Sequence, residues 1–122
     1  MEIRQSSEDY LEAILMLHQR KGMVRSIDIA EELSVTKPSV SVAMKKLRTN
    51  GYIEMDEYGF ISLLDKGREI AERMYERHTF ITRWLTSMGV DPQVAADDAC
   101  RIEHVISQET FDAMKRSLVD EE

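Results

Sequence analysis

The 122-residue chain has few of the residues that interrupt helices or staple small domains together. It contains 5 glycines, 2 prolines and one cysteine, Cys100. A single cysteine excludes an intramolecular disulfide framework and is compatible with a reducing compartment. Because glycine and proline are the main breakers of helices, their scarcity leaves few places where a helix must end. We therefore expect most of the chain to be helical.

Long apolar runs are also missing. No stretch approaches the 18 or so apolar residues that a membrane-spanning helix needs, and the first residues lack the apolar run of a signal peptide. With 43% hydrophobic and 32% charged residues, the composition is typical of a soluble globular protein. We therefore expect a cytoplasmic protein with no membrane partner.

An excess of positive charge is absent from the chain as a whole. The formal net charge is -7, which taken alone argues against a partner as acidic as nucleic acid. The charge is segregated, however, because residues 36–50 hold Lys37, Lys45, Lys46 and Arg48 and no acid. This segregation makes nucleic acid an expected partner despite the negative net charge. We expect binding only after cations reduce the negative charge of the rest of the chain.

Apolar periodicity predicts six helices, each ended by a glycine, a turn or a new cap. We expect Ser7, Asp91 and Ser107 to act as N-caps, and Pro38 to lie in the first turn of its helix, where proline is tolerated. The predicted helices cover about residues 7–21, 26–35, 36–51, 65–87, 91–106 and 107–118.

Between the third and fourth helices the period changes to that of strands. Two β-type runs, at residues 52–56 and 60–63, predict a hairpin. Two short helices joined by a tight turn and followed by a hairpin form a winged helix-turn-helix. We therefore expect a mostly α fold with a small β-hairpin wing: a DNA-binding domain over residues 1–64 and a helical domain over residues 65–122.

The third predicted helix carries groups suited to DNA. Its hydroxyls can reach base edges or phosphates, its ammonium groups can contact phosphates, and the amides of its first turn favour an anion. A basic helix face can also be merely solvated, but the helix-turn-helix topology favours DNA. The wing tip adds two residues, with acids beside them that limit its charge-based affinity. The candidate DNA-binding residues are Thr36, Lys37, Pro38, Ser39, Ser41, Lys45, Lys46, Tyr58 and Gly59.

A second set of residues has the chemistry of a metal site. Two acids stand three apart in the first predicted helix, and a thiol, a carboxylate and an imidazole recur at i, i+3 and i+4 of a later one. A further imidazole lies on the long predicted helix. Mixed oxygen, nitrogen and sulfur ligands suit a first-row divalent metal. The candidate metal ligands are Asp9, Glu12, His78, Cys100, Glu103 and His104.

Each candidate ligand also has a simpler interpretation. Asp9 and Glu12 can belong to a solvated acidic helix start, which the helix dipole favours. Cys100 alone can be a small packed hydrophobe, and His78 alone a solvated or core histidine. The H-E-x-x-H zinc pattern, a Ser/His/Asp arrangement and a glycine-rich phosphate loop are all absent from the sequence, so we expect no enzyme.

Over nearly its whole length the chain resembles the metal-dependent repressors of the diphtheria toxin repressor and manganese transport regulator family. The most specific motif is Cys-Arg-Ile-Glu-His at residues 100–104. The other matching motifs lie at residues 8–12, 27–33, 38–41, 65–67 and 77–78. The resemblance implies a homodimeric repressor of metal-uptake genes whose helical domain binds metal and dimerises, and which binds palindromic DNA operators when loaded with Mn²⁺ or Fe²⁺. It implies no organic substrate.

The ligand positions mix two branches of this family. The chain resembles the manganese-sensing branch in Asp9 and Glu12, but that branch typically carries glutamate at the place of Cys100. It resembles the iron-sensing branch in Cys100, but Thr82 and Ala96 replace two ligands of that branch's ancillary site. The resemblance leaves Mn²⁺ and Fe²⁺ open, with Zn²⁺ or Co²⁺ able to substitute in vitro, and implies the two-domain manganese-type architecture.

Two other functions stay open at the level of the sequence. A winged-helix regulator that responds to a small organic ligand would need an apolar pocket in the helical domain and would not respond to metal. A small metalloenzyme would use Glu103 or Asp9 as a general base beside a metal-activated water. The segregated charge and the resemblance favour the metal-dependent repressor over both.

Overall fold

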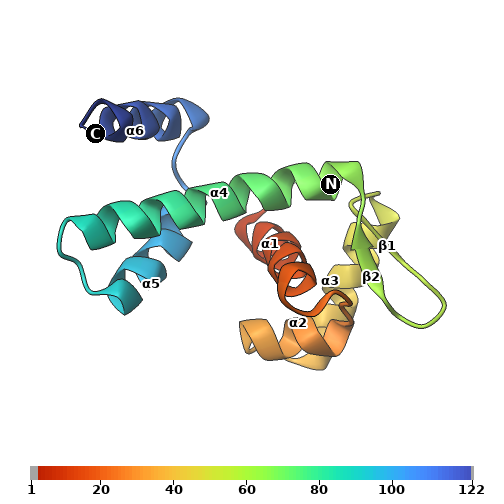
Figure 1. Cartoon of the computed structure of the whole chain (residues 1–122). Coiled ribbons are helices and arrows are strands. Elements are labelled where there is room, and N and C mark those ends of the chain that lie inside the picture. The colour runs from red at the N-terminus through yellow and green to blue at the C-terminus, as the bar shows by residue number, and fades with distance from the viewer. Residues whose placement is uncertain (1–2, 122) are drawn as a thin grey trace. The chain divides into compact units, whose positions relative to one another are not determined.

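The computed structural model describes residues 3–121, so Met1 and Glu2, part of the segment without a signal-peptide run, lie outside it, as does Glu122. Six helices and one hairpin confirm the predicted mostly α fold (Figure 1). In chain order the elements are α1 (Gln5–Lys21), α2 (Ser26–Leu33), α3 (Lys37–Thr49), β1 (Ile53–Met55), β2 (Ile61–Leu63), α4 (Asp65–Ser87), α5 (Pro92–Ile102) and α6 (Gln108–Glu121). None of the described helices is long and apolar enough to cross a membrane.

The chain divides into two compact units, Met1–Arg73 and Met74–Glu122. The division falls inside α4, so the first part of this helix belongs to one unit and the remainder to the other. The predicted domain boundary after residue 64 stays a prediction, since both units share the helix that follows it.

In the first unit, α1 forms the centre of the core. Every residue from Leu11 to Leu15 is buried, and α2, α3 and β2 all contact this helix. The buried side chains of α3 are Val40, Met44 and Leu47, which recur at helical spacing and hold its remaining face toward solvent. The helix-turn-helix is thus fixed on α1 with one side of α3 exposed.

The wing pairs β1 and β2 in antiparallel register, with Glu54 opposite Ser62. The Ile61 N–H donates to the Val24 carbonyl at 2.8 Å, which ties the hairpin to the segment before α2. His18 Nε2 lies 2.8 Å from the Ile61 carbonyl oxygen. This histidine therefore attaches α1 to the wing.

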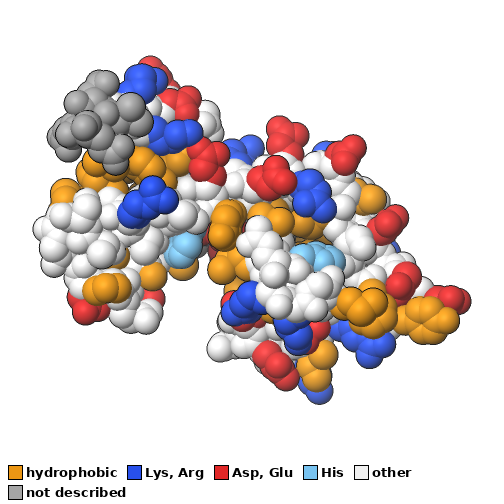
Figure 2. Space-filling model, viewed as in Figure 1, with side chains coloured by type: hydrophobic (Ala, Val, Ile, Leu, Met, Phe, Trp, Pro, Cys, Tyr) orange, Lys and Arg blue, Asp and Glu red, His pale blue; other side chains and the backbone are white. Residues whose placement is uncertain are grey.

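α4 begins in close contact with the end of the helix-turn-helix. Lys66 Nζ donates to the Asn50 carbonyl at 3.1 Å and lies 4.2 Å from the centre of the Tyr52 ring. One turn of helix places Gly67 against the Tyr52 carbonyl oxygen, where a Cβ atom would overlap it. A glycine is required there because the two backbones approach too closely for any side chain. Beyond this turn, acidic and basic side chains alternate on the exposed surface of α4 (Figure 2).

The second unit contains the remainder of α4, with α5 and α6. Its buried apolar residues include Ile81, Ala99 and Phe111, and the Phe111 ring packs edge-on against Phe80 with centroids 5.5 Å apart. The predicted N-caps of α5 and α6 are confirmed. Asp91 accepts from Gln93 N at 3.1 Å, and Ser107 Oγ accepts from Thr110 N at 3.0 Å.

The predicted N-cap of α1 and the predicted ends of α5 and α6 were wrong. α1 begins at Gln5 instead of after a Ser7 cap, since the Arg4 carbonyl already accepts the Glu8 N–H at 3.1 Å and no side-chain cap is needed. α6 extends to Glu121 instead of ending near residue 118. α2 begins at Ser26, within one residue of the predicted start, and the Asp28 carboxylate accepts the Arg25 N–H at 2.9 Å.

The third difference is at α5, which ends at Ile102 instead of near residue 106. Glu103 keeps helical dihedral angles and its N–H still donates to the Ala99 carbonyl. Its own carbonyl, however, accepts from the Arg77 guanidinium at 2.9 Å. The helix therefore stops where a side chain from α4 takes the place of the next helical N–H donor.

Candidate metal centre and nucleic-acid interface

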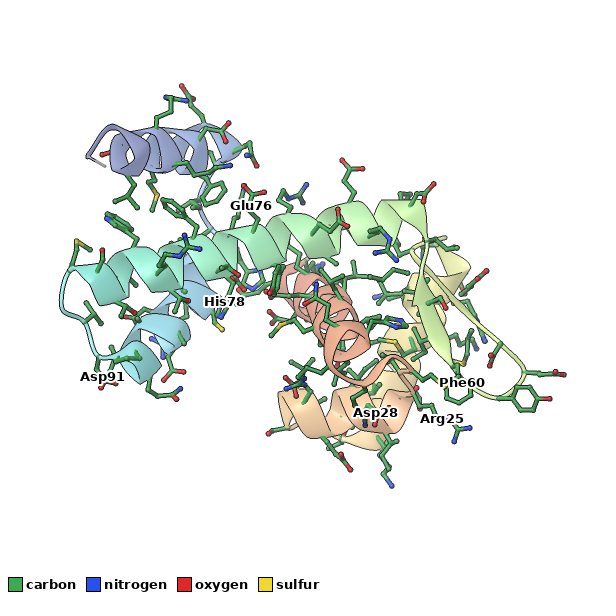
Figure 3. All side chains as sticks on the ribbon, in the orientation of Figure 1. Arg25, Asp28, Phe60, Glu76, His78 and Asp91 are labelled. Carbon is green, nitrogen blue, oxygen red and sulfur yellow. The ribbon has the colours of Figure 1, made fainter. Side chains whose placement is uncertain are left out.

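Three potential ligands meet in the second unit. His78 points from α4 toward the end of α5, on the opposite side of α4 from Glu76 (Figure 3). Cys100 lies in the last turn of α5, and Glu103 lies just beyond it. One ligand atom from each of these three side chains lies within 4.8 Å of the other two. The helical spacing that singled out Cys100 and Glu103 therefore places them beside a histidine from another helix.

Distances within this cluster fit a single metal ion. His78 Nδ1 lies 3.7 Å from Cys100 Sγ and 3.2 Å from Glu103 Oε2. Ligand atoms about 2.1 Å from a tetrahedral ion are themselves about 3.4 Å apart. The three side chains thus stand at about the separation that coordination of one ion requires.

Glu103 is the most buried of these groups, with 1% of its surface exposed. A carboxylate removed from water needs compensating positive charge or hydrogen bonds. His104 Nε2 lies 3.4 Å from Glu103 Oε1, so the carboxylate stands between two imidazoles. Because α5 ends at Ile102, Glu103 and His104 come from the turn after the helix instead of the helix face that the spacing predicted.

The charge state of His78 reflects this environment. Its hydrogen bond with Cys100, followed by that with Glu103, raises the pKa of His78 to about 10, against the opposing effect of burial. At neutral pH the metal-free imidazole therefore carries a proton that offsets the buried carboxylate. A metal cation bound by these side chains would offset the negative charge of Glu103 in the same way. It would have to displace the proton from His78.

The remaining candidate ligands belong to the first unit. Asp9 and Glu12 lie one helical turn apart on α1, at the spacing that places two side chains on the same side of a helix. Glu12 is 7% exposed and interrupts the run of buried apolar residues on α1. Burial of a carboxylate must be offset by hydrogen bonds or opposite charge, so Glu12 has a role other than apolar packing.

On α3, the predicted DNA-binding residues are accessible. The Thr36 hydroxyl caps the helix by accepting from Ser39 N at 3.3 Å, and Pro38 stands in the first turn as predicted. Every predicted DNA-binding residue from 36 to 46 is exposed. At the wing tip Tyr58 is 67% exposed, and Gly59 has a positive φ of 84° that closes the hairpin loop.

A groove of about 700 Å³ runs between the start of α1 and the exposed side of α3. No acidic residue is among the side chains that line it, whereas two cationic ones are. The lining residues are Arg4, Ser6, Ser7, Tyr10, Ser39, Val42, Ala43, Lys46, Leu47 and Asn50.

Family models match both the segment that carries α3 and the segment that carries the candidate metal centre. The family model of the iron-dependent repressor N-terminal DNA-binding domain matches residues 2–60, and that of the iron-dependent repressor metal-binding and dimerisation domain matches residues 64–120. The chain belongs to the iron-dependent repressor family. The resemblance inferred from the motifs is confirmed, and with it the role of a metal-dependent transcriptional repressor at the level of the family.

Individual relatives in this family agree with the assignment. The transcriptional regulator MntR of Escherichia coli O6:H1 is 37% identical over 112 residues, which cover 92% of this chain and 72% of the relative. The structure of the manganese regulator SloR superposes with a TM-score of 0.81 at 28% identity, covering 92% of this chain and 53% of that one. A manganese-dependent repressor in complex with manganese gives 0.83 at 25% identity, with coverages of 92% and 52%. The chain thus spans about half the length of these two solved regulators.

Two residues beside the candidate DNA-binding residues were not selected from the sequence. Val42 is apolar but 68% exposed, because Val40 and Met44 already fill the core side of α3. Arg4 lines the groove beside α3 but precedes the acid-free segment, so the charge pattern alone did not select it.

Proposed function

We propose that the chain represses transcription by binding a palindromic operator as a homodimer when it holds Mn²⁺ or Fe²⁺, and that its targets are genes for metal uptake. One observation carries the metal-sensing part. Glu103 is a buried carboxylate between two imidazoles with a thiol nearby, inside the region that matches the family's metal-binding domain. Such a carboxylate needs an offsetting positive charge, which the protonated His78 supplies in the metal-free protein and which a bound cation would supply in its place.

His78, Cys100, Glu103 and His104 are the ligands that we assign to the second unit. They offer nitrogen, oxygen and sulfur donors, the set that suits first-row divalent metals. We assign Asp9 and Glu12 of α1 as further ligands on the strength of their match to the family's ligand positions. The bound ion would neutralise the negative charge of the carboxylates among these ligands.

Mn²⁺ is our first choice of metal and Fe²⁺ the second. Carboxylate oxygens of Asp9, Glu12 and Glu103 are hard ligands that suit manganese, whereas the Cys100 thiolate is softer and favours iron, zinc or cobalt. The solved relatives are described as a manganese regulator and a manganese-bound repressor, which favours Mn²⁺. Zn²⁺ and Co²⁺ should bind in vitro.

For DNA we assign α3 to the major groove. In a homodimer the two copies of α3 would lie about 34–36 Å apart, one turn of DNA. The lysines of α3 supply phosphate contacts, and the hydroxyls and the exposed valine supply base contacts. The assigned residues are Thr36, Lys37, Pro38, Ser39, Ser41, Lys45 and Lys46 of the α3 segment and Tyr58 and Gly59 of the wing, to which we add Val42 because it is exposed.

The test is operator binding with and without metal. Fluorescence anisotropy of a labelled palindromic operator would be measured in Mn²⁺, Fe²⁺, Zn²⁺ and chelator, for the natural chain, Cys100→Ala, Glu103→Ala and the matched control Glu109→Ala, an exposed acid of α6. We expect the natural chain and Glu109→Ala to bind the operator tightly only when metal is present. Glu103→Ala should lose this response to metal. Equal affinity in metal and in chelator for the natural chain would exclude the proposal.

A second candidate function is a winged-helix regulator that responds to an organic ligand. A pocket of about 360 Å³ between α4 and α6 favours it, since small ligands occupy pockets of this size. Its lining residues are Tyr75, Glu76, Thr79, Phe80, Arg83 and Lys115. In this case chelator would leave operator binding unchanged, which the same anisotropy measurement detects.

A further inference from the structure

Arg77 is the one arginine that the described structure buries, at 6% exposure, and its contacts converge on the turn that carries two of the proposed metal ligands. Its Nη1 donates to the Glu103 carbonyl and to the Ile106 carbonyl, both at 2.9 Å. Its Nη2 donates to Gln108 Oε1 at 3.1 Å. The guanidinium therefore holds both ends of the turn between α5 and α6.

The geometry of a guanidinium explains why an arginine stands there. Backbone carbonyls at a helix end have no N–H of the same helix from which to accept a hydrogen bond. The planar guanidinium of arginine can donate hydrogen bonds to several acceptors at once. Hydrogen bonds from a charged donor are shorter and stronger than neutral ones. The Phe111 ring lies 5.6 Å from the guanidinium carbon and adds a cation–π contact. These contacts fix the arginine as well as the turn.

The position of Arg77 in the chain links this clamp to the metal centre. Arg77 immediately precedes His78 on α4, and the carbonyl that it binds belongs to Glu103, which immediately precedes His104. One interaction thus sets the register between the helix that carries one ligand and the turn that carries two others. The 3.2 Å separation of His78 Nδ1 and Glu103 Oε2 depends on this register.

We infer that Arg77 is a positioning residue that organises the metal centre before the ion arrives. The inference rests on the proposed function, since it concerns the same ligands. Without Arg77 all ligands are still present, but the turn that carries Glu103 and His104 loses the donor for its carbonyls and samples other conformations. The metal must then order the turn, so its affinity falls.

The test uses the full chain with Co²⁺ and Mn²⁺ alone as probes. We expect Arg77→Met to bind Co²⁺ at least tenfold more weakly, with an altered Co²⁺ absorption spectrum. Arg77→Lys should fall between Arg77→Met and the natural chain, because an ammonium keeps the charge without the fork. In the metal-free protein, hydrogen exchange at residues 103–106 should be at least tenfold faster in Arg77→Met.

Two controls separate positioning from a general loss of structure. Arg83→Met removes an exposed arginine from the same helix, and Ile81→Val lowers stability from a fully buried position of that helix. Both should bind Co²⁺ within twofold of the natural chain. The inference fails if Arg77→Met matches Ile81→Val in Co²⁺ affinity, or if exchange at residues 103–106 is unchanged.

Should Arg77→Met not fold, Arg77→Lys decides by the same two measurements. A threefold or greater loss of Co²⁺ affinity together with faster exchange supports the inference, and natural values of both overturn it. Failure of the natural chain to bind either metal contradicts the proposed function instead. The exchange measurement then still shows whether Arg77 holds the turn.

Discussion

At the scale of single residues, we expect the exposed side chains of α3 to divide between base contacts and phosphate contacts. Val42 is apolar and 68% exposed, in the middle of a face otherwise made of hydroxyls and ammonium groups. An apolar side chain in the major groove recognises the thymine methyl group, whereas a lysine binds phosphate regardless of sequence. The two kinds of residue should respond differently to substitution.

Val42→Ser should weaken binding to the natural operator by about 1 kcal/mol, roughly fivefold, and relax the preference for thymine at one position of each half-site. The salt dependence of binding should not change, because no phosphate contact is lost. Anisotropy against operators with single substitutions measures both. A uniform loss over all operators with a changed salt slope would contradict the assignment of Val42.

Lys46→Ala should lower affinity for all operators alike and reduce the slope of log affinity against log salt by about one. Lys46 lines the groove with Arg4 and carries no acidic neighbour there. Glu31→Ala, which removes an exposed charge of α2, serves as the control and should leave the slope unchanged. A change in sequence preference alone would show that Lys46 contacts a base.

The sequence predicted single residues well where local spacing decides their place. The i, i+3, i+4 pattern placed Cys100 and Glu103 together, and segregated charge selected an α3 face that is exposed. It grouped His78 with Glu103 by chemistry but did not predict their 3.2 Å separation, since spacing within one element does not give distances to another. The charge pattern did not select Val42 either, because that pattern marks only charged and polar side chains.

At the scale of elements, the ends of helices depend on both local and distant groups. The caps Asp91 and Ser107 are local, with acceptors two to three residues from their donors, and the sequence predicted both. The end of α5 depends on Arg77 from α4, so no pattern within α5 could predict it. Two further elements lend themselves to tests.

The start of α2 should show a defined dependence on pH. The hydrogen bond from Lys21 and that from the Arg25 N–H hold the pKa of Asp28 below its usual value of 3.8. A lowered folded pKa means that the charged carboxylate stabilises the fold above pH 3.8 and that this contribution is lost as the pH falls through the folded pKa. The helix start is therefore weakened by acid.

Asp28→Asn should accordingly cost about 1 kcal/mol of unfolding free energy at pH 7, and the difference from the natural chain should shrink below pH 3.8. Urea denaturation of the metal-free protein at several pH values measures it. Glu31→Gln on the same helix is the control, with an expected difference near zero. A difference for Asp28→Asn that is independent of pH would exclude the charge as its cause.

The start of α4 should tolerate no side chain at position 67. Gly67→Ala places a methyl group on the Tyr52 carbonyl oxygen, so the backbones must separate at a cost of about 1–3 kcal/mol. Arg68→Ala, exposed on the next position of the helix, should change stability by less than about 0.5 kcal/mol. Thermal denaturation compares them, and equal melting temperatures would show that this contact is not tight in solution.

At the scale of the whole molecule, the net charge of -7 combines the charges of segments that we assign to two different functions. The acid-free segment from residue 36 to residue 50 is the proposed DNA-binding surface, and some of the acids elsewhere are the proposed metal ligands. Repulsion between an acidic protein and DNA is weakest when those acids are neutralised, so a cation favours the complex through charge as well as geometry. Metal and operator should therefore bind cooperatively.

Linkage gives the most direct measurement of this claim. The affinity of the natural chain for Mn²⁺ would be measured with and without a saturating palindromic operator, and its affinity for the operator with and without saturating Mn²⁺. If metal switches the protein, operator affinity rises by about 5-fold to 150-fold on adding Mn²⁺, and operator raises Mn²⁺ affinity by the same factor. An operator affinity that Mn²⁺ does not change, together with a Mn²⁺ affinity that the operator does not change, would contradict the account.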